Sequence, residues 1–266
     1  MTGTQISLDG GEHAVVLIHG LTGSPYELKS LARSLNKAGF TVKGPLLAGH
    51  GTKLEDLVKT RWEDWYGTVH AAVKDFQKTH ETVSVSGLCM GALLALCLAS
   101  DPECEITALS LLSTTIFYDG WSLPWYRFLL PISYLPPFKY FYSYKERDPY
   151  GVKNERMRRE VALSLKESAI VYDRFPSQCL HELFKIIRRT KIILPEVTAP
   201  TLIIHAREDD IVSTKNADYV ERRIGSRNVR KIILDDSYHM VTLDNQKEVV
   251  AEEVTRFFKE AVSQFL

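Results

Sequence analysis

Short apolar runs and helical repeats of apolar residues alternate along much of the chain. Residues 14–18 (AVVLI) form a continuous apolar run rich in β-branched residues, which predicts a buried strand. Leu28, Leu31 and Leu35 then recur at helical spacing and stop before Gly39, a residue that favours a helix end. By the same reasoning we expect strands at 40–43, 82–86, 106–112, 201–205 and 230–234, and helices at 62–76, 92–99, 216–223 and 249–262.

This alternation of strand and helix lapses between residues 113 and 200. Strands that alternate with helices usually pair in parallel and are covered by helices on both faces. We therefore expect an α/β fold with a mostly parallel central sheet, and the length of 266 residues favours a single core. Residues 1–112 and 201–266 are expected to form this core, and residues 113–200 an inserted cap or lid.

The inserted segment is rich in aromatic residues, with 12 of the chain's 27 between positions 117 and 144. Most of them are expected to pack the cap onto the core, because aromatic side chains are usually buried. The alternative is an apolar pocket for an acyl group. Its candidate substrate-binding residues are Trp121, Trp125, Tyr126 and Phe128.

Composition limits the classes of partner. The 33 basic residues balance the 33 acidic ones, so nothing indicates a nucleic-acid partner. Four prolines interrupt the most apolar stretch, residues 121–141, and we expect no membrane span, although docking on a membrane surface is compatible with it. The N-terminal residues lack the features of a secretory signal and the four cysteines form no CxxC pair, so we expect a cytoplasmic protein with reduced thiols.

The stretch VSVSGLCMGALLAL, residues 83–96, has the pattern of a nucleophile elbow. Gly87 and Gly91 allow a strand to turn sharply into a helix, which places the side chain of residue 89 at the top of the sheet, beside the helix N-terminus. This pattern usually carries serine. Cys89 is therefore interpreted as the nucleophile, with a disabled nucleophile and an ordinary core thiol as the alternatives.

A nucleophile of this kind requires an acid and a base later in the chain, in that order. His239 follows the last expected strand and is predicted to be the general base. HAREDDIV follows the strand before it, and Asp209 is the preferred orienting acid, with Asp210 second and Glu208 third. Both loops lie at the carboxyl ends of parallel strands, where open α/β sheets bind their ligands.

The developing oxyanion also needs donors, and two backbone N–H groups are expected to supply them. These are the N–H of Met90, directly after the nucleophile, and the N–H of Leu21, in the loop that follows the first expected strand. A backbone donor tolerates any side chain, so the identities of these two residues carry little information. His19 is expected to hold the loop rather than to take part in catalysis.

These motifs together resemble the α/β-hydrolase family, and more narrowly its small bacterial carboxylesterases and monoacylglycerol lipases. The resemblance rests on VVLIHGLTGSPYELKSLA, GPLLAGHG, VSGLCMGALLAL, HAREDDIV and SYHMVTLDNQKEVVAEEV, and it covers about two thirds of the chain. It implies the α/β-hydrolase fold and the same triad of Cys89, Asp209 and His239. Cysteine replaces the serine of those esterases, a feature that instead resembles dienelactone hydrolases and polyhydroxyalkanoate synthases.

The resemblance implies a carboxylic-ester hydrolase that acts on an apolar acyl ester, lactone or thioester through a covalent acyl-enzyme. Two alternatives stay open: an acyltransferase that uses the same thioester, and a disabled or engineered Ser-to-Cys form that binds acyl ligands without turnover. We expect no cofactor and no metal, because His181 and Glu182 lack a second histidine at helical spacing and the chain has no phosphate-binding glycine loop. Cys97 and Cys104 are expected to be ordinary thiols.

Overall fold

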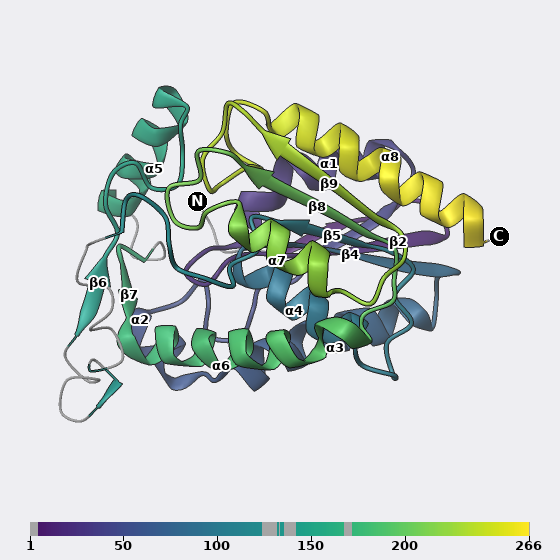
Figure 1. Cartoon of the computed structure of the whole chain (residues 1–266), viewed down its shortest axis with the longest axis horizontal. Helices are drawn as coiled ribbons and strands as arrows, with labels where there is room; N and C mark the ends of the chain where they lie inside the picture. Colours follow the sequence, from purple (N-terminus) through teal and green to yellow (C-terminus); the bar gives the residue numbers. More distant parts are fainter. Residues whose placement is uncertain (1–4, 124–131, 133, 136–141, 168–171, 266) are drawn as a thin grey trace.

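A seven-stranded sheet forms the centre of the protein, which we describe from a computed structural model (Figure 1). The structure describes residues 5–123, 132, 134–135, 142–167 and 172–265. The strand order is β1-β3-β2-β4-β5-β8-β9. The strands are β1 (Ile6–Leu8), β2 (His13–Ile18), β3 (Thr41–Gly44), β4 (Thr82–Leu88), β5 (Leu109–Leu112), β8 (Thr201–Ala206) and β9 (Val229–Leu234).

Six of these strands run parallel, and only β1 pairs antiparallel, with β3. The prediction of a mostly parallel sheet is confirmed. The register aligns Ile18 of β2 with Gly87 of β4, and Leu88 of β4 with Leu112 of β5. The loops that leave β2, β4 and β5 therefore begin side by side at the carboxyl edge of the sheet.

Helices cover both faces of the sheet, as the sequence pattern predicts. On one face α1 (Lys29–Lys37) packs against α8 (Lys247–Phe265), and on the other α4 (Met90–Ala99) packs against α3 (Trp62–Gln77) and α6 (Ser177–Ile193). The remaining helices are α2 (Leu54–Lys59), α5 (Glu155–Glu167), α7 (Lys215–Arg223) and the short 3-10 turns Pro25–Leu28 and Leu194–Glu196. Each face has its own apolar cluster, so the sheet separates two cores.

The inserted segment divides into two parts with different surroundings. The strands β6 (Ser143–Lys145) and β7 (Arg174–Pro176) pair antiparallel and lie with α5 at one end of the molecule (Figure 1). Helix α6, in contrast, runs along the sheet and buries its apolar side against α3 and α4. The C-terminal part of the segment thus belongs to a layer of the core.

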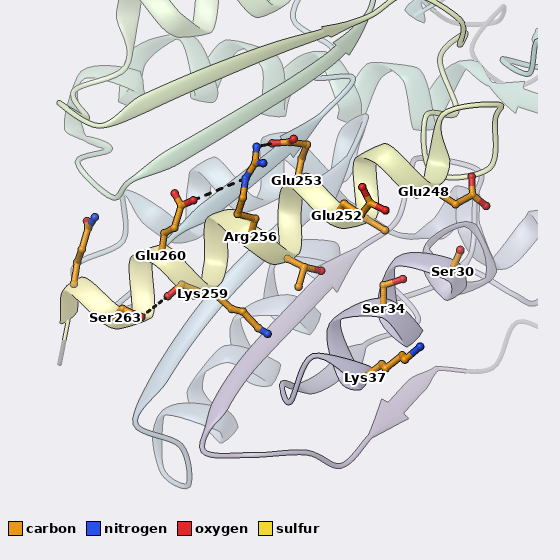
Figure 2. Close-up of a pocket in the computed structure, with 13 residues that line it drawn as sticks. Ser30, Ser34, Lys37, Glu248, Glu252, Glu253, Arg256, Lys259, Glu260 and Ser263 are labelled. Atoms are coloured by element: carbon orange, nitrogen blue, oxygen red, sulfur yellow. Dashed lines mark hydrogen bonds and ion pairs between the residues drawn. The ribbon is translucent and has the colours of Figure 1, made fainter.

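No helix within the described ranges is both long enough and apolar enough to cross a membrane. A groove of about 930 Å³ lies between α1 and α8 (Figure 2). Ser34 and Lys37 line one side of it, and Arg256 on the other side pairs with Glu253 and Glu260. None of the predicted catalytic residues lines this groove, and its charges are of mixed sign.

Candidate active site

Cys89 lies at the turn between β4 and α4, as the elbow pattern predicts. Its backbone has φ of 57° and ψ of −114°, a conformation that residues with a side chain rarely adopt. A Cβ atom on Gly87 would lie 2.1 Å from the carbonyl oxygen of Gly91, and one on Gly91 would lie 2.1 Å from that of Ile18. Both glycines are therefore required for the close approach that holds Cys89 in this strained position.

Asp209 and His239 meet although they come from different loops, after β8 and β9. The Nδ1 atom of His239 lies 2.9 Å from Oδ2 and 3.1 Å from Oδ1 of Asp209, and both residues are buried. Oδ1 also accepts the backbone N–H groups of Ile211 and Val212, each at 2.9 Å. These bonds hold the carboxylate against the imidazole and favour the tautomer in which Nδ1 carries the proton.

The other two acids of the same loop have different partners. Asp210 is buried, and its Oδ1 accepts the backbone N–H of His239 at 3.4 Å rather than a ring N–H. Glu208 is half exposed and forms an ion pair with Lys153 at 2.5 Å. Of the three acids that the sequence offered, the structure thus brings Asp209 to the imidazole ring.

Burial and the neighbouring charges act in opposite directions on the pKa of His239. Burial disfavours the charged ring, but the nearby negative charges of Asp209 and Cys89 outweigh burial, so the pKa of His239 lies well above its ordinary value. The ring nitrogen Nε2 is buried and makes no hydrogen bond within the described part of the chain. An imidazole held in this way is suited to accept a proton at Nε2 and to carry the resulting charge.

Thr115 is a partner of Cys89 that the sequence reasoning missed. Its Oγ1 lies 3.2 Å from Sγ of Cys89 and 3.3 Å from the carbonyl oxygen of Ser113. Ser113 has a positive φ of 46°, and its hydroxyl donates to the backbone carbonyl of His239 at 2.7 Å. One short segment after β5 therefore touches both the thiol and the loop of the base.

The loop that follows β2 is held by two buried histidines. The backbone N–H of Leu47 donates to Nε2 of His19 at 3.2 Å, so Nδ1 carries the proton and donates to the carbonyl oxygen of Gly20 at 2.9 Å. His50, from the GHG sequence, contacts the carbonyl oxygen of Leu21 through Nε2, and the two imidazole rings lie 4.9 Å apart. Burial lowers the pKa of both histidines, which keeps them neutral.

The two expected oxyanion donors lie in the loops that flank the nucleophile. The backbone N–H of Leu21 donates to no acceptor among the residues that the structure describes. Met90 is the first residue of α4, where a backbone N–H has no acceptor inside the helix. Gly20, next to Leu21, approaches Cys89: a Cβ built on it would lie 3.7 Å from the Cys89 Cβ.

Two carboxyl groups near His239 were also missed. Burial raises the pKa of Glu27 to about 7 and the pKa of Glu146 to about 8, and the charge of Glu27 adds to the shift of Glu146. Oε2 of Glu27 accepts the backbone N–H of Gly20 at 3.3 Å, beside the expected oxyanion loop. The surroundings of His239 therefore contain acids that titrate near neutral pH.

The four aromatic residues expected to bind an acyl group fare differently. Trp121 is 60% exposed, its indole N–H donates to the carbonyl oxygen of Glu208 at 3.1 Å, and its ring contacts Tyr238. Trp125, Tyr126 and Phe128 lie outside the described residues. Tyr118, which the sequence reasoning did not single out, lies close enough to Cys89 for a thiolate charge to raise its pKa further, beyond the larger effect of burial.

Comparisons with known proteins give relatives that match over almost the whole chain. The thermostable monoacylglycerol lipase of Bacillus sp. (strain H-257) is 29% identical, and the match covers 94% of this chain and 92% of that protein. The carboxylesterase of Bacillus subtilis (strain 168) is 25% identical and covers 97% of both.

Solved structures agree with this chain in fold. A metagenome-derived lipolytic enzyme, from a study of LipS and LipT, has a TM-score of 0.82 at 26% identity and covers 97% of this chain and 98% of its own. A soluble variant of monoglyceride lipase from Saccharomyces cerevisiae has a TM-score of 0.80 at 14% identity, covers 98% of this chain and 89% of its own, and shows the fold alone. The predicted α/β-hydrolase fold is confirmed. The Hydrolase_4 family model, serine aminopeptidase S33, matches residues 11–246, and the chain belongs to this family of α/β-hydrolases.

Proposed function

We propose that this protein is a carboxylic-ester hydrolase that forms a covalent acyl-enzyme on Cys89. The observation that carries the proposal is the buried pair of Asp209 and His239, whose imidazole interacts with the Cys89 thiol held in a strained elbow. The names of the matched relatives, a monoacylglycerol lipase and a carboxylesterase, support the same reaction class. The substrate would be a small apolar acyl ester, lactone or thioester.

In the proposed reaction the proton of Cys89 passes to Nε2 of His239, and Sγ attacks the carbonyl carbon of the substrate. The electron pair of the carbonyl moves to its oxygen, which the backbone N–H groups of Leu21 and Met90 would stabilise, typically by about 3 to 4 kcal/mol per donor. The alcohol or thiol then leaves with the proton from His239, and a thioester forms. Water attacks the thioester, again with His239 as base, and the carboxylic acid leaves with Cys89 restored.

A thiol nucleophile favours activated acyl groups. The thioester intermediate is higher in energy than an oxygen ester, so its formation from a thioester, lactone or aryl ester is easier than from an alkyl ester. The intermediate is also more reactive toward water or another nucleophile. Thr115 supports the thiol in this scheme, because its hydroxyl donates to the sulfur when it releases the carbonyl oxygen of Ser113.

The inserted segment 113–200 is proposed to be the cap, with α6 anchored in the core. The packing of α6 against α3 and α4 supports this anchoring. Tyr118 would contribute to an apolar acyl pocket between the cap and the nucleophile, since it lies near Cys89 and its ring contacts Phe184 of α6. Trp121 is too exposed to line an enclosed pocket, but its ring would form part of the pocket entrance.

The test is a reaction with a short p-nitrophenyl ester, followed both by absorbance and by intact mass. A burst of one nitrophenol per chain is expected, with one acyl group on the peptide that contains Cys89. Cys89→Ala should abolish burst and adduct, whereas Cys97→Ala, which changes another buried thiol of α4, should retain both. Absence of adduct and turnover in the parent protein would contradict the proposal.

Two further outcomes separate the alternatives. If added alcohols or amines take most of the acyl group in competition with water, the protein is an acyltransferase with the same intermediate. If the parent protein binds esters without turnover and Cys89→Ser turns them over, the thiol form is a disabled serine esterase. Either result would replace hydrolysis by Cys89 as the function.

A further inference from the structure

Three metal-ligating side chains gather at the far end of α4, away from the proposed active site. His70 lies on α3, and Asp101 and Cys104 lie in the turn that follows α4. One ligand atom from each of these side chains lies within 4.8 Å of the other two. Cys89 precedes the first residue of α4, so the ten residues of this helix, at about 1.5 Å each, separate the cluster from the nucleophile by about 15 Å.

The turn Asp101–Cys104 is organised by its own hydrogen bonds. The backbone N–H of Cys104 donates to the carbonyl oxygen of Asp101 at 3.0 Å, and the backbone N–H of Glu103 donates to Oδ1 of Asp101 at 2.9 Å. Lys74 of α3 adds a bond from its Nζ to the carbonyl oxygen of Glu103 at 2.8 Å. The carboxylate and the thiol are therefore presented by a backbone that is already fixed.

The separations in this cluster are too long for direct hydrogen bonds, and the three ligand atoms, all within 4.8 Å of one another, would have to close by up to about 1 Å to reach the spacing of a zinc site. Nε2 of His70 lies 3.9 Å from Oδ2 of Asp101 and 3.8 Å from Oε2 of Glu103, beyond the range of a hydrogen bond. Zinc bonds of about 2.0–2.3 Å in tetrahedral geometry place neighbouring ligand atoms roughly 3.3–3.8 Å apart. Neither ring nitrogen of His70 makes a hydrogen bond within the described ranges, so Nε2 has its lone pair available when Nδ1 carries the proton.

A neighbouring tyrosine holds the central carboxylate in place. The hydroxyl of Tyr66 donates to Oδ2 of Asp101 at 2.5 Å, and its ring lies 5.7 Å from the ring of His70, one helical turn along α3. Carboxylate ligands of metal sites commonly have such outer partners, which fix their orientation. The side chains of His70 and Asp101 are 27% and 25% exposed, and Cys104 is buried, so the cluster is shielded but reachable from solvent.

We propose that His70, Asp101 and Cys104 form a three-residue binding site for a divalent ion of the zinc type, with a solvent molecule to complete the coordination. Imidazole, thiolate and carboxylate together are a ligand set that zinc accepts. Binding requires the thiolate, so each ion releases one proton from Cys104. The ion would tie α3 to the end of α4 and stabilise the fold, and it would take no part in the ester chemistry.

This proposal departs from the expectation of a chain without metal, and the test below decides between them. The sequence offered no metal motif because His70 stands far from the turn in the chain, and only the packing of α3 against α4 joins them. The proposal does not depend on the esterase function, and its failure would leave that function untouched.

The test is a titration of the metal-free protein, without a histidine tag, with Co²⁺ and then with Zn²⁺. One equivalent of Co²⁺ should produce a thiolate-to-cobalt charge-transfer band in the near ultraviolet and intense tetrahedral bands in the visible, and Zn²⁺ should remove them. Cys104→Ser should lose the charge-transfer band, whereas Cys97→Ser and Cys89→Ser should keep it. This separates the cluster from the other thiols.

Two substitutions on α3 measure how much each residue contributes to the Zn²⁺ affinity. His70→Gln should weaken Zn²⁺ binding by more than about 100-fold, and Tyr66→Phe by about 10-fold, the range typical of an outer partner. Zn²⁺ should raise the melting temperature of the parent protein and of Cys97→Ser, but not that of His70→Gln. Circular dichroism of the metal-free variants is the control for correct folding. Absence of the cobalt bands in the parent protein, or their persistence in Cys104→Ser, would overturn the proposal.

Discussion

Replacement of Asp209 by asparagine tests the acid–base pair most directly. The side chain of Asp209 is fully buried, and its two oxygens lie 2.9 and 3.1 Å from Nδ1 of His239. An asparagine oxygen would keep the bonds from the N–H groups of Ile211 and Val212, which leaves the NH₂ group to face the ring. Nδ1 must then accept a hydrogen bond, so the proton moves to Nε2, and the ring can no longer take the proton of Cys89.

We expect kcat/KM of Asp209→Asn for a p-nitrophenyl ester to fall by about 10³-fold, which corresponds to about 4 kcal/mol of transition-state stabilisation. Asp210→Asn is the matched control, because Asp210 is also buried but its carboxylate accepts the backbone N–H of His239 rather than a ring N–H. Glu208→Gln is a second control on the surface. An equal loss in Asp210→Asn, or retention of more than a tenth of the activity in Asp209→Asn, would refute this assignment.

The same substitution has a consequence for stability that depends on pH. The pKa of His239 is raised in the folded protein, because the charges of Asp209 and Cys89 outweigh burial, so the charged ring stabilises the fold. This contribution is fully present below the ordinary histidine pKa of about 6.5 and is lost as the pH rises through the folded value. Urea unfolding should therefore show a larger loss of stability in Asp209→Asn at pH of about 6 than in alkaline buffer.

Three further predictions concern residues around the site. Thr115→Val should slow alkylation of Cys89 by iodoacetamide by about 10-fold, since a hydrogen bond to a charged group is worth about 1.5–3 kcal/mol. Thr114→Val changes a buried hydroxyl that has no partner in the described chain, and it should leave the alkylation rate unchanged. Equal rates in the two variants would exclude a supporting role for Thr115. Gly91→Ala should lower the free energy of unfolding by about 1–3 kcal/mol or more, because the added Cβ would lie 2.1 Å from a backbone oxygen of β2. The control Gly67→Ala has open space around it and should stabilise α3 by about 0.5–1 kcal/mol. Urea unfolding curves measure both, and a Gly91→Ala variant as stable as the parent would show that the elbow can relax. Burial raises the pKa of Glu146 from 4.5 to about 8, so the stability that the protonated carboxyl contributes is lost as the pH rises through that range. Glu146→Gln should therefore make the free energy of unfolding less dependent on pH between about 5 and 8. An unchanged pH dependence would argue against a carboxyl that stays protonated in the fold.

Local sequence patterns determined the sheet, most of its helices and the elbow. Apolar runs and helical repeats depend only on neighbours in the chain, so strands β2, β4 and β8 and helix α3 lie where the pattern predicted them. The boundaries of the elements were predicted less accurately. The strand β5 begins at Leu109 rather than at residue 106, because an apolar run does not mark where the pairing of a strand begins. The strand β1 has only three residues and was not predicted, since so short a segment carries no clear period.

Chain order also indicated the acid and the base, because parallel strands bring their carboxyl ends to one edge of the sheet. It ranked Asp209 before Asp210 and Glu208, but the three are adjacent in sequence and no spacing rule separates them. The choice depends on where each side chain points after the loop has folded, and the backbone N–H bonds to Asp209 decide it. The candidate triad was thus predictable as a pattern, while the contact between Asp209 and His239 was not.

Tertiary structure alone revealed the groups that reach the site from distant segments. Thr115, His50 and Glu146 belong to three segments that share no spacing rule with Cys89. The fold brings Thr115 to Cys89, His50 to the loop of Leu21, and Glu146 close enough to His239 for their charges to interact. The cluster of His70 with the turn after α4 arises in the same way, from helix packing. Periodicity encodes which face of an element is buried, but contacts between elements depend on strand order and packing, which no local pattern contains.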